Sequence, residues 1–416
     1  MLPESTSTSQ KKPRVPVAGA ATALVLLTAL NFVNYIDRYI LPGVQELVKS
    51  EFHVSDARIG ALTFWFFLTY MLAAPATGWL GDHYPRKPLI VCGALFFSAI
   101  NFFTATVHTF FALNLRHAAL GIGEASFGIF APALLADFYP EEDRNRILTI
   151  FYTAIPVGAA LGYLAGGVIG GTYGWRFPFY VSAIPGVVTA LLVLFCMKEP
   201  KRGAMDRPAH RDKATMLSLA RNAPYLYATL GMAMITFSLG GISAWMPSFL
   251  QRTGYSAAGT GTLVGGITAV TGITGTIVGG WLAHLWMRRN RGALYLLSAW
   301  SALLAVPPAL LCFFGPRWAL LPGFAMAEFC IFLGTGPLNA AIVNSVNAAV
   351  RATAVAIELF LIHALGDLPS PVIIGAISDR STLALGLGVT LVTMVIAAVL
   401  LFAGARTVHT VREPVT

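Results

Sequence analysis

Long apolar segments follow one another along the whole chain, and they constrain its fold more than any other feature. A helix needs about 20 apolar residues to cross the roughly 30 Å hydrocarbon core of a membrane. The segments of about this length are 17–41, 57–80, 88–107, 109–138, 146–171, 176–197, 223–250, 257–287, 292–314, 317–345, 352–376 and 381–404. The composition agrees, because 56% of the residues are hydrophobic and only 11% are charged, whereas a soluble domain carries about 25% charged residues. We therefore expect an all-α membrane protein with twelve transmembrane helices.

A basic, polar stretch at 198–222 separates the first six spans from the last six. Its charge and its proline and glycine content are typical of a linker. We predict that it joins two six-helix bundles, at 17–197 and 223–405. A disordered cytoplasmic N-terminal segment (1–16) and a cytoplasmic tail (406–416) are expected to flank them.

A short repeat indicates that the two bundles are related. Gly78-Trp79-Leu80-Gly81-Asp82 follows the second span, and Gly280-Trp281-Leu282-Ala283-His284 follows the eighth. Parallel six-helix repeats are a common plan among transporters, which bind their substrate near the membrane midplane between the halves. We therefore expect two pseudo-symmetric bundles with a binding site between them.

The net charge of +9 reflects membrane topology rather than nucleic-acid binding. With the N-terminus in the cytoplasm, most Lys and Arg residues fall in cytoplasmic segments, as the positive-inside rule requires. Both termini are then cytoplasmic, and no nucleic-acid partner is expected. The four cysteines lie in different spans without metal-ligand spacing, so we expect neither a metal site nor a cofactor.

Two spans contain charges that a purely structural helix would avoid. Asp37 and Arg38 lie in the first span, and Arg116 and Glu124 lie in the fourth. Each charge costs at least about 2.5–3.5 kcal/mol at the centre of a bilayer. We expect the four to face a shared polar cavity, where they handle a charged substrate, a proton or both.

The residue types suggest different roles for these charges. Asp37 and Glu124 are candidates for proton coupling, since a carboxylate changes its proton affinity with desolvation and with a nearby cation. Arg38 and Arg116 stay protonated and suit an anionic substrate, and Asn34 lies on the same helix face as Arg38. Arg116 and Glu124 are about 12 Å apart along one helix, so we predict Asp37 as the partner of Arg116. The alternative is a structural salt bridge between the first and fourth helices.

One loop has the pattern of a known transporter signature. The segment Gly78–Ile90 resembles the loop motif of the major facilitator superfamily, with Pro85 where the motif has glycine. In that family the motif's acid, here Asp82, locks one conformational state; alternatively, the charged residues only anchor the loop. The residues expected to act in the gate are Gly78, Asp82, Arg86, Lys87 and Asp137.

Longer stretches are similar to the Spinster branch of this superfamily. They are Asn34–Arg38, Arg116–Gly128, Phe151–Tyr163 and Arg351–Arg380, which together span both halves. The resemblance implies a proton-linked or facilitated carrier of lysophospholipids or sphingoid phosphates, in the cell membrane of a bacterium. It also implies proton coupling and head-group contact at the positions that match those of the intramembrane charges.

The second half supplies weaker candidates. His363 and Asp367 are ionisable residues of the eleventh span, and we assign them to the cavity or the gate. Pro369 and Pro371 are predicted to break the helix just beyond them. An amphiphilic substrate also needs an apolar wall, for which the candidates are Tyr70, Phe127 and Phe237.

The function expected from these features is proton-coupled transport of an amphiphilic anionic lipid by a monomer in contact with membrane lipid. A small organic-anion or drug transporter of the same superfamily is the main alternative. A receptor or a membrane enzyme is the remote one, because the sequence lacks a Walker loop, a zinc-binding His-Glu pair and a Gly-x-Ser-x-Gly elbow.

Overall fold

The computed structural model describes residues 16–201, 205, 219–346 and 351–410. The predicted N-terminal segment, most of the linker and the end of the tail lie outside these residues. Every regular element within them is helical, and 12 helical stretches are long and apolar enough to cross a membrane. The predicted fold class is therefore confirmed.

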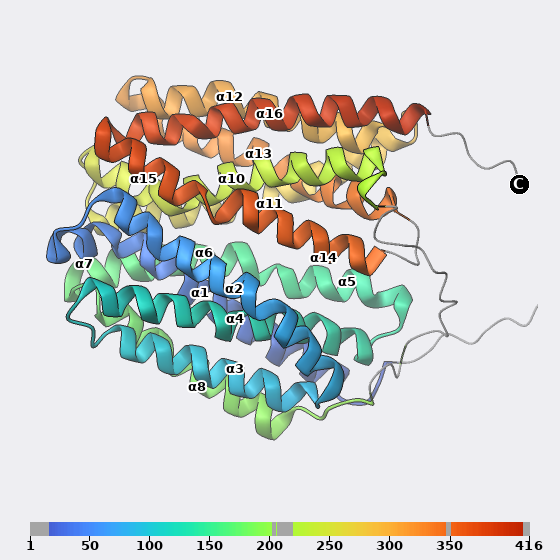
Figure 1. Ribbon diagram of the computed structural model, residues 1–416, viewed down its shortest axis with the longest axis horizontal. Helices are drawn as coiled ribbons and strands as arrows, with labels where there is room; N and C mark the ends of the chain where they lie inside the picture. The colour runs from blue at the N-terminus through green and yellow to red at the C-terminus, as the bar shows by residue number, and fades with distance from the viewer. Residues whose placement is uncertain (1–15, 202–204, 206–218, 347–350, 411–416) are drawn as a thin grey trace, which may run out of the picture.

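The two bundles follow each other along the chain and lie side by side (Figure 1). The first, here the N half, comprises α1 (Ala20–Phe52), α2 (Asp56–His83), α3 (Arg86–Thr104), α4 (Phe110–Phe138), α5 (Glu141–Tyr152), α6 (Ala154–Leu164), the π turn η1 (Ala165–Ile169), α7 (Gly170–Tyr173) and α8 (Phe177–Cys196). The second, here the C half, comprises α10 (Ala223–Arg252), α11 (Ala257–Met287), α12 (Ala293–Phe314), η2 (Arg317–Ala319), α13 (Leu320–Asn344), α14 (Arg351–Ile362), the π turn η4 (His363–Asp367), α15 (Ser370–Arg380) and α16 (Leu383–Thr410).

Local sequence explains where several helices begin. Ser55, Thr109, Asn222 and Ser256 precede α2, α4, α10 and α11, and each side chain accepts a hydrogen bond from a backbone N–H of the first turn. Such caps satisfy donors that have no partner within the helix.

The structure extends two of the predicted helices. α1 continues to Phe52, eleven residues past the predicted end of its apolar span at 41. Val44 and Val48 remain buried in this extension while Glu46, Lys49 and Glu51 are interspersed with them, so hydropathy falls although the helix continues. Likewise, α16 runs to Thr410, into the predicted tail.

A π turn interrupts the fifth span of each half, namely η1 in the first and η4 in the second. The prolines had predicted a break after Asp367, and the chain does turn at Leu368 and Pro369 before α15 begins. The π geometry itself was not predicted. Single π turns occur frequently at functional sites.

Glycines allow close contact at one of the places where the halves meet. Gly167 of η1 and Gly261 of α11 approach so closely that a Cβ on Gly261 would lie 2.9 Å from the Gly167 Cα. Gly265 likewise packs against the backbone of Ala160. We call this contact of α6 and η1 with α11 the glycine seam.

The regular small-residue stripe of the fifth span packs elsewhere. Gly158, Gly162 and Gly166 face α1, within the N half. These glycines therefore close the N half, whereas Ala160 and Gly167 of the same span meet α11. A second place where the halves meet is the contact of α2 with η4 and α15, which we call the polar seam.

Candidate functional site

An ion pair joins the first and fourth helices inside the N half. Arg38 Nη2 lies 2.5 Å and Nε lies 3.0 Å from Glu124 Oε2. Glu124 is only 1% exposed, and no protein group in the described chain bonds to its Oε1. The structure thus brings together two of the four intramembrane charges, in a pairing that the sequence had suggested only as a structural alternative.

Aromatic rings surround the guanidinium of this pair. The Arg38 Cζ lies 4.9 Å from the ring centroid of Tyr35, 5.1 Å from that of Phe66 and 5.8 Å from that of Phe67. Cation–π contacts of this kind stabilise a desolvated guanidinium. Arg38 is consequently held from two directions, by a carboxylate and by ring faces.

The same aromatic group reaches the C half. The Phe67 ring stacks on His363 at a centroid distance of 5.1 Å, and the Tyr70 ring meets His363 edge-on at 5.7 Å. His363 Nδ1 in turn lies 2.8 Å from Asp367 Oδ2. A line of contacts therefore runs from the Arg38–Glu124 pair across the polar seam to two residues that the sequence had assigned to the cavity or gate.

Asp37 points away from this line. It is 1% exposed, and no described protein group meets hydrogen-bond geometry with either carboxylate oxygen. The polar side chains beside it are Ser182 of α8 and Asn101 of α3. An uncompensated buried carboxylate is costly, which makes this residue the most unusual of the four charges.

Arg116 is not part of the group. Its Nη1 donates to Thr106 Oγ1 at 3.0 Å, and its guanidinium lies 6.0 Å from the Phe103 ring centroid. The predicted Asp37–Arg116 pair is therefore wrong. Spacing along a helix gives distance but not the identity of the neighbouring helix, and here the loop between α3 and α4 supplies the partner.

The chain's relatives agree with this architecture. A family model of the Major Facilitator Superfamily matches residues 27–359. Protein spinster homolog 1 of Xenopus tropicalis is 32% identical over 389 residues, covering 87% of this chain and 73% of the relative. Sphingosine-1-phosphate transporter SPNS2 of Danio rerio is 33% identical over 394 residues, covering 88% and 77%. The chain belongs to the Spinster branch of the major facilitator superfamily.

A solved structure shows the same fold. The bacterial homologue of the human lysosomal transporter Spinster, in an inward-facing and unoccupied conformation, superposes with a TM-score of 0.86 at 22% identity, covering 96% of this chain and 100% of that one. This Spinster chain is thus an integral, multi-pass membrane transporter and not an enzyme.

Three of the other predicted binding residues of this Spinster protein lie along the line of contacts across the polar seam. Asn34 is buried beside Glu124, and Tyr70 lies against His363. Phe237 is 5% exposed and borders the π turn η4 through Gly366. Phe127, however, packs inside the N half against Phe151, so the prediction that it lines a lipid-binding surface is wrong.

The predicted gate residues lie at the end of α2 and nearby. Arg86 Nη1 is 2.5 Å from Asp137 Oδ2, which links α3 to α4 within the N half. Lys87 follows in the first turn of α3, and Asp82 is exposed near the end of α2. Gly78 makes no close helix contact, because a Cβ there would meet nothing within 4 Å in the described structure.

The structure reveals a buried acid of the C half to which the sequence analysis assigned no role. Glu328 of α13 is 4% exposed. Its two carboxylate oxygens accept hydrogen bonds from Thr268 Oγ1 at 2.9 Å and Thr271 Oγ1 at 3.0 Å. The threonines of α11 are three residues apart, the spacing that places both on one helix face, and this was the signal available in the sequence.

This acid gives a stability prediction. Glu328→Leu should lower the free energy of unfolding by about 1–3 kcal/mol, because buried hydroxyls lose their acceptor. Thr268→Val and Thr271→Val added to it should recover most of that loss, since no polar group is then left unpaired. Denaturant unfolding in detergent measures both, and equal stability of the single and triple variants would contradict the assignment.

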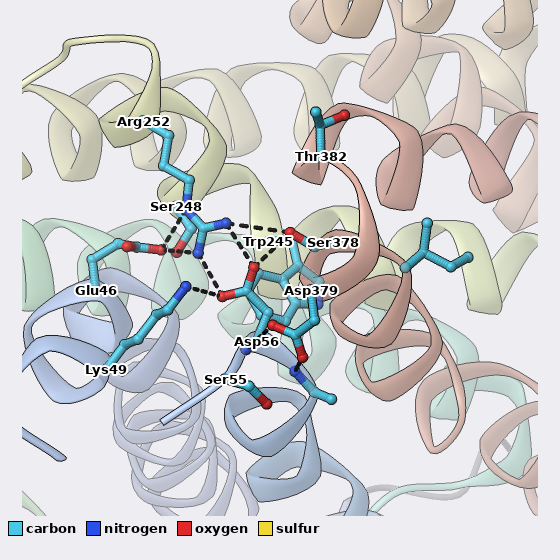
Figure 2. Close-up of polar contacts among 12 residues, drawn as sticks. Glu46, Lys49, Ser55, Asp56, Trp245, Ser248, Arg252, Ser378, Asp379 and Thr382 are labelled. Atoms are coloured by element: carbon cyan, nitrogen blue, oxygen red, sulfur yellow. Dashed lines mark hydrogen bonds and ion pairs between the residues drawn. The ribbon is translucent and has the colours of Figure 1, made fainter. Parts of the chain in front are cut away.

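A second group of charges, missed by the sequence analysis, joins the two halves (Figure 2). Asp56, at the start of α2, is 2% exposed and pairs with Arg252 of α10, whose Nη1 lies 2.7 Å from its Oδ2. Lys49 Nζ lies 2.5 Å from Asp56 Oδ1, and Ser378 of α15 donates to Oδ2 at 2.5 Å. Arg252 also binds Glu46 Oε1, with its Nη2 2.6 Å away. We call this end of the molecule the closed end.

Proposed function

We propose that this Spinster transporter carries a lysophospholipid, or a related amphiphilic anionic lipid, by alternating access. The observation that carries the proposal is the Arg38 guanidinium, held by Glu124 and three rings beside the polar seam. A fixed cation framed by aromatic faces suits a lipid whose anionic head adjoins an apolar tail. The relative SPNS2, described as a sphingosine-1-phosphate transporter, supports a lipid-like substrate.

The proposal extends to coupling and orientation. Asp37 and Glu124 are buried carboxylates with oxygens that no described protein group bonds, and we assign them to proton transfer. The protein is placed in a bacterial cell membrane with both termini in the cytoplasm, as its distribution of Lys and Arg favours. Asp82, Arg86, Lys87 and Asp137 then belong to the cytoplasmic gate.

Uptake into proteoliposomes tests the substrate class. We expect labelled lysophospholipid to enter protein-containing liposomes, and unlabelled lysophospholipid to compete with it far better than small organic acids do. Competition by small acids alone would identify a small-anion transporter instead. Protein-free liposomes and the Arg38→Ala variant correct for spontaneous lipid insertion.

Coupling gives a separate prediction. With an imposed proton gradient, Asp37→Asn or Glu124→Gln should abolish gradient-driven uptake but leave substrate exchange measurable, because the amide cannot carry a proton. Asp143→Asn, which changes an exposed carboxylate, is the matched control. Unchanged gradient dependence in both variants would exclude these carboxylates as the coupling groups.

A further inference from the structure

The helices α2 and α15 run antiparallel across the polar seam, and the last two turns of each contain a glycine followed four residues later by an aspartate. In α2, Gly78 precedes Asp82 by four residues, and Asp82 is the last residue but one of the helix. In α15, Gly375 precedes Asp379 by four residues, and Asp379 is again the last residue but one. Because the helices are antiparallel, the end of α15 lies beside the start of α2, while the end of α2 lies at the opposite end of the molecule (Figure 1).

At the closed end, the last turn of α15 contacts the N half through Asp379 (Figure 2). Asp379 Oδ1 accepts a hydrogen bond from the Asp56 backbone N–H at 2.7 Å, and Oδ2 accepts one from that of Ala57 at 2.9 Å. These N–H groups open α2 and have no acceptor within the helix. They also form the positive end of the helix dipole, which favours a carboxylate. A residue of the C half therefore caps a helix of the N half.

Gly375, near the end of α15, allows this helix to approach the start of α2 closely. A Cβ on Gly375 would lie 2.5 Å from the carbonyl oxygen of Asp56 and 2.9 Å from the backbone nitrogen of Ala57. Only a residue without a side chain allows α15 to come this close to the start of α2. Gly60, one turn further along α2, is in similar contact with the Pro371 backbone.

At the opposite end the equivalent glycine makes no such contact. A Cβ on Gly78 would meet nothing within 4 Å in the described structure. In Figure 1, the end of α2 and α14 diverge, whereas the start of α2 lies beside α15. The two endings thus match in sequence, but only the glycine of the α15 ending is in close contact with backbone of the opposite half in the described structure.

We propose that Gly375–Asp379 is a conformational latch, which stabilises the state closed at this end by capping α2 and releases α2 once in every transport cycle. Asp82 ends α2 in the same way at the opposite end, where the family motif is already expected to lock the alternate state. This rests on the alternating-access part of the proposed function, and not on its substrate. The latch is distinct from the Asp56–Arg252 pairs, because its acceptor is the Asp379 carboxylate and its donors are backbone groups.

Distances between spin labels across the closed end test the latch. Labels are placed at Arg58→Cys and Ser381→Cys, both exposed, after replacement of Cys92, Cys196, Cys312 and Cys330. Asp379→Ala should raise the ratio of long to short distances about tenfold, since removing a helix cap typically costs that factor in an equilibrium. Asp82→Ala should lower the same ratio.

Further variants separate the latch from general damage. Gly375→Ala should also raise the ratio, because its Cβ cannot be accommodated in the closed contact, and this holds even if Asp379→Ala fails to fold. Glu51→Gln is the matched control and should change nothing, because Glu51 pairs at 2.6 Å with Arg176 inside the N half. Unchanged distances in folded Asp379→Ala and Gly375→Ala, or a rise in Asp82→Ala, would overturn the proposal. The distances are measured without substrate, so a failed lysophospholipid assay leaves this result intact.

Discussion

Arg38→Ala is expected to abolish transport and to destabilise the protein. The variant removes the guanidinium that pairs with Glu124, and so leaves a carboxylate that is 1% exposed without a cation. Breaking a buried pair in this way costs about 3–5 kcal/mol. A comparable loss of substrate binding would slow uptake by about 100-fold or more. Unfolding in denaturant and lysophospholipid uptake measure the two effects on the same preparation.

A double variant separates the two effects. Arg38→Met combined with Glu124→Leu removes both charges, and apolar replacements of a buried pair are often neutral or stabilising. We expect stability to recover while transport stays absent, because the cation that attracts the substrate is gone. Transport by the double variant would mean that the pair only holds α1 against α4.

Asp56→Ala is expected to open the closed end. The variant deprives Arg252, Lys49 and Ser378 of their shared acceptor and leaves Arg252 paired with Glu46 and in a long hydrogen bond to Ser378. Because Asp56 is almost fully buried, we expect a cost to the closed state of about 3–5 kcal/mol. The reactivity of Ser248→Cys with a polar maleimide reports on opening, since Ser248 is fully buried between the halves and bonds to Gln45.

The controls for this experiment lie on the same helix. Arg58→Ala removes an exposed charge of α2 and should leave the Ser248→Cys reactivity unchanged. We expect Asp56→Ala to raise it by a factor of ten or more, in line with the cost above. Equal reactivity in both variants would show that the ion pairs do not keep this end closed.

The membrane spans could be predicted because hydropathy is a local property of the chain. The ends of the helices were harder to predict from hydropathy. In α1, the last eleven residues are helical although Glu46, Lys49 and Glu51 lower the hydropathy there. The helix continues because α1 packs against neighbours on one face, and those neighbours are distant in sequence. Local signals cannot supply such contacts.

The candidate site was predicted in its residues but not in its pairing. The four intramembrane charges were evident from their cost in lipid, yet Arg116 faces Thr106 and not Asp37. The sequence shows that a residue lies in a helix, but not how far that helix is rotated toward its neighbours. The Asp56 group was missed for a related reason, because charges at helix ends resemble ordinary surface residues until both halves are in place.

The two seams between the halves differ in what their stability depends on. The glycine seam is backbone packed on backbone, and contacts of that kind are insensitive to dissolved ions. At the closed end, which includes the α1–α10 contact beside the polar seam, Arg252 and Glu46 remain 28% and 23% exposed, so mobile ions can screen their attraction. Salinity on that side of the membrane therefore acts on the closed end and not on the glycine seam. A change in the ionic strength on that side of the membrane, without any change in substrate or proton supply, is expected to alter how long the transporter stays closed at that end.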